Sequence, residues 1–128
     1  MSITPIRVLF FLAAAYDGVL ASVALSFGPS LFQYFEVTPP NHWGYIQFPA
    51  LLLLVFAAMF VQVGRDPRRY AHLIPYGMGL KAAYCGVVFW HQAMGSIPSP
   101  WLPWAWADLG FLALFLLAHR SLRGGTAA

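Results

Sequence analysis

The stretch 72–94, HLIPYGMGLKAAYCGVVFWHQAM, decides how this chain must be arranged. Its length and apolar content are typical of a membrane-spanning helix, yet Lys81 lies near its middle. A lone ammonium in hydrocarbon costs several kcal/mol, so Lys81 must face other helices and find a partner among them. Asp17 and Asp108, each in the middle of another apolar stretch, are the two residues that can answer it. The segment therefore predicts a helix bundle with a charged centre.

The composition agrees with a membrane protein. The 128 residues are 60% hydrophobic and 17% aromatic, and only 9% are charged, whereas about a quarter of residues are charged in soluble domains. The net charge of +3 does not indicate nucleic-acid binding, because the arginines lie between apolar stretches and form no patch interleaved with aromatic residues. The length predicts a single domain over residues 1–128.

Three further apolar stretches have the length of membrane spans. With ~1.5 Å of rise per residue, ~20 residues cross the ~30 Å of hydrocarbon. Together with the first stretch, they give predicted spans at 5–27, 45–63, 72–94 and 101–119. Short connections make consecutive spans antiparallel neighbours. The fold is therefore predicted to be an all-α, antiparallel four-helix bundle in the membrane.

The first span carries two local signals. Small residues recur every four positions, at Ala14, Gly18, Ser22 and Ser26, a pattern that favours close approach of a second helix. Gly28-Pro29 is expected to end the span. The segment 30–37, with apolar and polar residues mixed, is then expected to form a short interfacial helix.

Positive charges and tryptophans fall on opposite sides of this four-span arrangement. One side carries Arg7, Arg65, Arg68, Arg69, Arg120 and Arg123, and the other carries Trp43, Trp90, Trp101, Trp104 and Trp106. Loops rich in arginine stay in the cytoplasm, and tryptophan is enriched at membrane interfaces. Both termini are therefore predicted to be cytoplasmic, in a bacterial inner membrane.

The same arrangement places the three mid-span charges at one depth. Asp17, Lys81 and Asp108 lie roughly 18, 14 and 17 Å from the cytoplasmic side at ~1.5 Å per residue. We therefore expect them to meet. Because two carboxylates and one ammonium leave one negative charge in a low dielectric, one carboxyl should hold a proton or accept a cation or a donor such as Tyr16 or Tyr84.

Two interpretations of this centre stay open. It could be a structural clasp that fixes which helices pair and in what register. It could also be a proton or substrate site, since ionisable residues inside membranes often mark such paths. Aromatic residues one and two turns from Asp108, at Trp104, Phe111 and Phe115, are expected to line the centre in either case.

No other pattern predicts a cofactor. His42, His91 and Met94 could come together at the outer face, where histidine and thioether ligands would suit copper or haem, but no spacing enforces such a set. Contact with a quinone, a lipid or haem therefore stays open without being predicted. Cys85, the single cysteine, excludes an intrachain disulfide.

Two blocks of sequence resemble those of small bacterial inner-membrane proteins. They are PPNHWGYIQFP at 39–49, and IPYG at 74–77 running on to Lys81, Tyr84, Cys85 and Gly86. In length and four-span layout the chain is similar to DoxX-like proteins. That group includes a membrane subunit associated with a thiosulfate:quinone oxidoreductase, so the resemblance implies an accessory role that depends on a partner.

The expected function is a non-enzymatic accessory or assembly subunit of a larger bacterial membrane complex, with respiratory and photosynthetic complexes as candidates. The small size and the absence of room for a soluble catalytic domain favour it. The alternative is a small proton-coupled transporter, or a membrane protein that binds a hydrophobic ligand, using the Asp-Lys-Asp cluster. Expected partners are the lipid bilayer and a protein of such a complex, and a homo-oligomer is also open.

Overall fold

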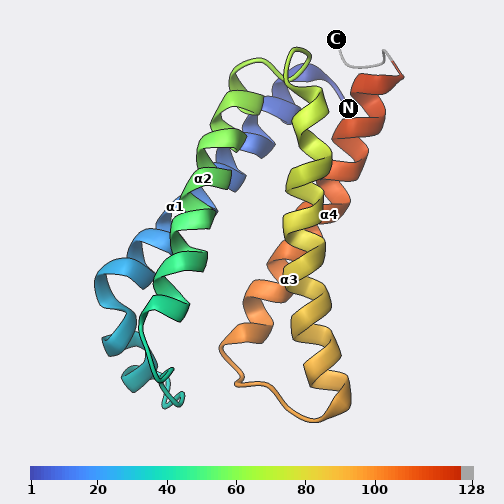
Figure 1. Cartoon of the computed structure of the whole chain (residues 1–128). Helices are drawn as coiled ribbons and strands as arrows, with labels where there is room; N and C mark the ends of the chain where they lie inside the picture. Colours follow the sequence, from blue (N-terminus) through green and yellow to red (C-terminus); the bar gives the residue numbers. More distant parts are fainter. Residues whose placement is uncertain (125–128) are drawn as a thin grey trace.

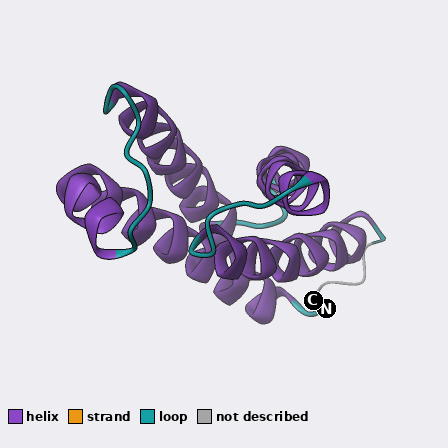
Figure 2. Ribbon diagram, turned by 90° about the horizontal axis from the view of Figure 1, so that it is seen from below, coloured by secondary structure: helices purple, strands orange, loops and turns teal. Residues whose placement is uncertain are grey.

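Four long helices joined by short connections make up the part of the chain that the computed structural model describes, residues 1–124 (Figure 1). They are α1 (Ile3–Tyr34), α2 (Gly44–Arg65), α3 (Ile74–Met94) and α4 (Trp101–Arg123), and a 3-10 turn, η1 (Ala71–Leu73), leads into α3. Within those residues the chain is helix and loop with no strand, as Figure 2 shows in a view from below. The predicted all-α fold of four antiparallel helices is confirmed.

Three of these helices are long and apolar enough to cross a membrane, namely α1, α2 and α4. The third helix, with 21 residues, is only one residue shorter than α2, which has 22, so its length does not set it apart. It is less apolar because Lys81, glycines and histidine interrupt its sequence. The chain therefore has the architecture of a multi-pass membrane protein.

The helices pack as two antiparallel hairpins, α1 with α2 and α3 with α4 (Figure 1). Contacts within each hairpin are far more extensive than those between hairpins, which run from α1 to α4 and from α2 to α3. The free ends of α1 and α4 lie together, since the Met1 amino group donates a hydrogen bond to Ser121 Oγ at 3.1 Å. Residues that join the hairpins therefore decide whether there is one bundle or two.

Small residues form the seam of the first hairpin. Buried small residues recur every seven positions on both helices, at Ala14, Ala21 and Gly28 on α1 and at Ala50, Ala57 and Gly64 on α2. A seven-residue repeat is nearly two helical turns, so it keeps one face of each helix against the other. Without bulky side chains in between, the backbones approach closely: a Cβ added to Gly18 would lie 3.8 Å from that of Ala57.

This seam corrects the predicted four-residue stripe. Ala14 is buried and Gly18 faces α2, as expected, but Ser22 and Ser26 are exposed. A four-residue repeat drifts around an α-helix with 3.6 residues per turn, so it leaves the contact face after about two turns. Ala21 and Gly28 continue the face instead.

The first helix bends where the sequence predicts that it ends. Helical backbone continues to Tyr34, and only Phe27, with φ −131° and ψ 21°, departs from it. Pro29 lacks an N–H and its ring clashes with the preceding turn, which explains a bend at this point. The expected separate interfacial helix is therefore the last part of α1, beyond the bend.

Glu36 closes the end of α1 in a left-handed conformation, with φ 55°. The Glu36 N–H donates to Gln33 O at 3.2 Å and the Val37 N–H to Phe32 O at 2.9 Å. These are the two hydrogen bonds of a Schellman motif, in which glycine usually occupies the left-handed position. The turn directs the chain into the linker that leads to α2.

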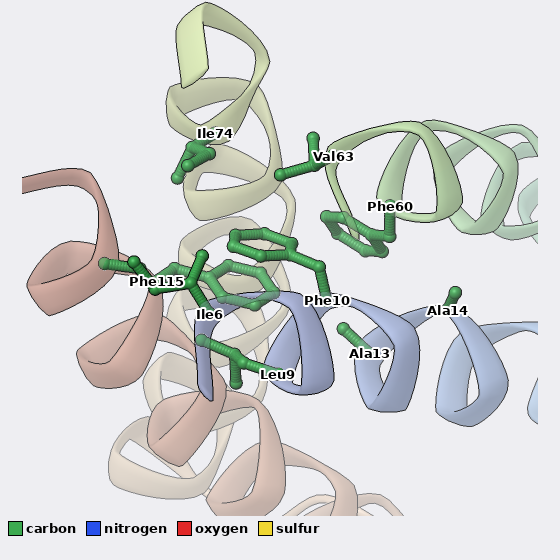
Figure 3. Close-up of a cluster of buried hydrophobic side chains, with 10 residues drawn as sticks. Ile6, Leu9, Phe10, Ala13, Ala14, Phe60, Val63, Ile74 and Phe115 are labelled. Carbon is green, nitrogen blue, oxygen red and sulfur yellow. The ribbon is translucent and has the colours of Figure 1, made fainter. Parts of the chain in front are cut away.

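A hydrophobic cluster joins all four helices at the end where the chain starts (Figure 3). Its centre is a set of three fully buried rings, Phe10 of α1, Phe60 of α2 and Phe115 of α4. Phe10 stacks on Phe115 with ring centroids 4.6 Å apart, and Phe60 lies 5.3 Å from Phe115. Ile74 adds the start of α3. This hydrophobic cluster lies next to the charged centre, on the side toward the start of α1.

We expect Ala21→Leu to destabilise the fold, because the seam at this fully buried position has no room for a larger side chain. Overpacking of this kind costs about 1–3 kcal/mol. The control is Ser22→Leu, next to it on α1 but exposed. Thermal unfolding in mild detergent measures both, and an equal loss in the two variants would contradict the seven-residue seam.

A second steric test concerns Gly77 of α3, where an added Cβ would lie 3.1 Å from Phe60 Cζ and closer still to Phe60 Cε1. Phe60 is fully buried among other rings and cannot swing away. Gly77→Ala should therefore lower the unfolding temperature in the same assay. Gly79→Ala, on the same helix with no atom within 4 Å, should raise it or leave it unchanged, because alanine favours helix over glycine by about 0.5–1 kcal/mol.

Candidate functional site: the Lys81 cluster

The Lys81 ammonium lies between two carboxylates from different helices. Its Nζ donates hydrogen bonds to Asp17 Oδ1 of α1 at 2.9 Å and to Asp108 Oδ1 of α4 at 3.1 Å. The predicted meeting of the three mid-span charges is thereby confirmed. The Asp108 bond lies inside the second hairpin, whereas the Asp17 bond joins the two hairpins.

Helix register brings these residues together. Buried residues of α3 recur at Ile74, Lys81 and Val88, seven apart, and Asp108 and Phe115 have the same spacing on α4. Lys81 and Asp108 thus occupy facing positions of an antiparallel seam, and the charges replace one apolar layer of it. Asp17 follows Ala13 by one turn on the buried face of α1.

The cluster is enclosed by protein. Lys81 is 0% exposed, Asp17 1% and Asp108 7%. The side chain of Asp108, at 10%, is the most accessible of the three, against 2% for that of Asp17.

Aromatic rings from three helices surround the ammonium. Lys81 Nζ lies 5.1 Å from the ring centroid of Tyr16, 5.2 Å from that of Phe111 and 5.9 Å from that of Phe60. At these distances the ring faces attract the cation. Phe111 lies beside the ammonium as expected. Trp104 instead packs on Tyr16, with ring centroids 6.0 Å apart, and Phe115 lies in the hydrophobic cluster.

Phe60 is the member that sequence reasoning misses. Its helix contains no charge between Gly44 and Val63 and looks uniformly lipid-facing. The signal that could have found it is position: Phe60 lies one turn after the buried Ala57, on the face that meets α1 and α3.

Tyr84 and Cys85 share the Lys81 side of α3 but bond elsewhere. The Tyr84 hydroxyl donates to Trp101 O at 3.0 Å, and the Cys85 thiol donates to Ala105 O at 3.3 Å. Both acceptors are backbone carbonyls of the first turn and a half of α4. Tyr84 therefore does not donate to the carboxylates, contrary to expectation, and the two residues fix the register of α3 against α4.

Two buried polar atoms of the cluster have no hydrogen-bond partner among the described residues. They are the hydroxyl oxygen of Tyr16 and the second carboxylate oxygen of Asp17, Oδ2. Unpaired polar atoms are uncommon inside proteins, because burial without a partner costs roughly 1–3 kcal/mol. Tyr16, the other expected donor, therefore contacts the ammonium with its ring, and its hydroxyl donates to neither carboxylate.

The outer-face candidates form no common site in the described residues. His42 Nδ1 accepts a hydrogen bond from the Gly44 N–H at 2.9 Å, so it caps the start of α2. His91 and Met94 lie on exposed positions at the end of α3. In residues 1–124 no group of three or more His, Cys, Asp or Glu side chains is arranged to hold a metal ion.

Comparisons of the chain with protein-family models, with curated proteins and with solved structures find no match.

Removing the ammonium should be costly, because Lys81→Met leaves two carboxylates facing each other in an enclosed site. Breaking a buried ion pair from one side costs about 3–5 kcal/mol, so folded yield in mild detergent and unfolding temperature should both fall sharply. Arg69→Met, which removes an exposed cation, should change neither.

The triple variant Lys81→Met, Asp17→Asn, Asp108→Asn tests the cause of that loss. With no charge left in the cluster, it should recover much of the yield lost in Lys81→Met. A triple variant no better folded than the single one would show that charge imbalance is not the reason.

Proposed function

We propose that this protein is a non-enzymatic accessory or assembly subunit of a larger bacterial membrane complex. The observation that carries the proposal is the outward apolar surface. In the most apolar 18-residue segment of each of α1, α2 and α4, only 33%, 22% and 22% of the residues are buried within the chain. A lipid bilayer can cover the rest, and the proposal is that a neighbouring protein covers part of it.

The enclosed charged centre supports the same function. Lys81 uses its hydrogen bonds inside the bundle, and the carboxylates that meet it come from the other hairpin and the facing helix. This arrangement suits a clasp that gives the two hairpins one relative position. A subunit that docks through its outer faces needs that fixed shape.

We place all four helices across the membrane with both termini in the cytoplasm. Since α3 leads from the end of α2 back to the start of α4 (Figure 1), a bilayer crossed by its neighbours is also crossed by α3. Arginines gather at the end shared by the start of α1, the end of α2 and the end of α4, where the Arg7 side chain donates to Gly64 O at 3.0 Å. That asymmetry favours a cytoplasmic location for this end.

The resemblance to DoxX-like proteins in length and layout adds a reason to expect a partner. The residues 1–124 contain little besides the four helices and their connections, which leaves the helix faces as the main docking surface. A hydrophobic-ligand or proton-coupled transport function is the second candidate, favoured by the unpaired polar atoms of Tyr16 and Asp17.

The proposal predicts that cross-links to protein come from one side of the bundle. A photo-activated cross-linking residue is placed, one variant at a time, at an exposed position of each helix: Val19, Val55, Val87 and Leu117. In the native host, one or two of these positions should give a single, reproducible protein adduct, and mild-detergent purification should yield a complex of fixed composition containing that protein.

The positions on the other helices serve as controls for random collisions. Adducts of equal strength from all four helices, or from none, would contradict a docking face. Proton or solute flux through purified protein in vesicles, absent from Asp17→Asn, would favour the transport candidate instead.

A further inference from the structure

The buried cluster contains more negative than positive charge. One ammonium, Lys81, faces two carboxylates, Asp17 and Asp108, and none of the three residues is more than 7% exposed. If all three are ionised, one negative charge is left over. In an enclosed site of low dielectric such a charge is costly unless a cation answers it.

The single positive charge of the ammonium balances only one of the two carboxylates. Two of its three N–H groups donate to Oδ1 atoms of the carboxylates, and aromatic rings lie on its other sides. The second oxygen of Asp17, Oδ2, receives no hydrogen bond from any described residue and is fully buried. An acceptor atom thus stays open at the centre of the bundle.

Among the described residues packed around the cluster, no other side chain supplies a positive charge or donates a hydrogen bond to Asp17 Oδ2. The second helix contributes the Phe60 ring. From α3, Tyr84 and Cys85 donate to backbone carbonyls of α4. From α1, Tyr16 places its ring against the ammonium, and its hydroxyl oxygen is buried without a partner.

We propose that the Asp17–Lys81–Asp108 cluster is a binding site for one small monovalent cation, a proton or Na⁺, with Asp17 Oδ2 as its ligand. A carboxylate oxygen and a phenol oxygen are hard ligands of the kind that suit Na⁺, and the same carboxylate oxygen accepts a proton by forming an O–H bond. Either cation makes the cluster neutral. Asp108 has the most exposed side chain of the cluster, at 10%.

This inference does not depend on the proposed subunit function. A clasp that also binds a cation would still hold the hairpins together, and it would hold them more tightly when the cation is bound. A ligand that binds the folded state alone stabilises it in proportion to the logarithm of its concentration. The dependence of stability on cation concentration therefore reports the site directly.

The experiment measures thermal unfolding of wild type, Asp17→Asn and Glu36→Gln in mild detergent. One series raises Na⁺ at constant pH, with choline replacing it at constant ionic strength, and a second lowers the pH in choline alone. Asp17→Asn removes the excess charge and keeps an acceptor for Lys81. Glu36→Gln removes an exposed acidic residue outside the cluster and is the matched control.

In wild type and Glu36→Gln, the unfolding temperature should rise by several degrees for each tenfold increase in the concentration of the cation that binds. A rise with Na⁺ at constant pH identifies Na⁺. A rise on acidification in choline identifies a proton, since stability increases as pH falls wherever the folded state binds more protons than the unfolded state. Asp17→Asn should show neither dependence.

The proposal is overturned if wild type responds to neither cation, or if Asp17→Asn responds as wild type does. Should Asp17→Asn not fold, Asp108→Asn removes the same excess charge and is measured in its place. Infrared spectroscopy of the wild type gives a second readout that needs no variant: a protonated carboxyl band identifies a proton, and its absence together with no response to Na⁺ rejects the site.

Discussion

The burial of one ammonium within an apolar helix is the constraint on which the rest of this structure depends. Lys81 can stay inside only because carboxylates from two other helices reach it at 2.9 and 3.1 Å. That requirement brings α1 and α4 to the same side of α3 and fixes their positions along the axis of the bundle. The flanking rings of Tyr16, Phe60 and Phe111 then close the site around the charge.

The convergence of Asp17, Lys81 and Asp108 could be predicted because it follows from depth alone. Charges are few in this chain, burying each one unpaired is costly, and antiparallel spans that place all three at one depth let them pair with one another. No knowledge of side-chain packing is needed for that step. The bend of α1 at Phe27, in contrast, was expected as an end, because glycine and proline signal an interruption without saying whether the helix resumes.

The small-residue seam and the place of Phe60 could not be predicted in the same way. Ala14 belongs both to the four-residue series with Gly18 and to the seven-residue series with Ala21, and only the partner helix decides which series is buried. In α2, nearly every residue is apolar, so hydrophobicity cannot separate the side that faces lipid from the side that faces Lys81. Packing selects Ala50, Ala57, Phe60 and Gly64 for shape.

Each of the two aspartates has a structural reason to be present. Asp108 answers Lys81 within the second hairpin, where the facing register of α3 and α4 places it. Asp17 answers the same ammonium from the first hairpin and so couples the two halves, which otherwise share a limited contact. The excess negative charge is therefore a consequence of how the bundle is joined: one cation serves two helix pairs, and the second carboxylate keeps an open oxygen. Because one ammonium joins the two hairpins through two carboxylates, the centre of the bundle has the electrostatic conditions for holding a small cation.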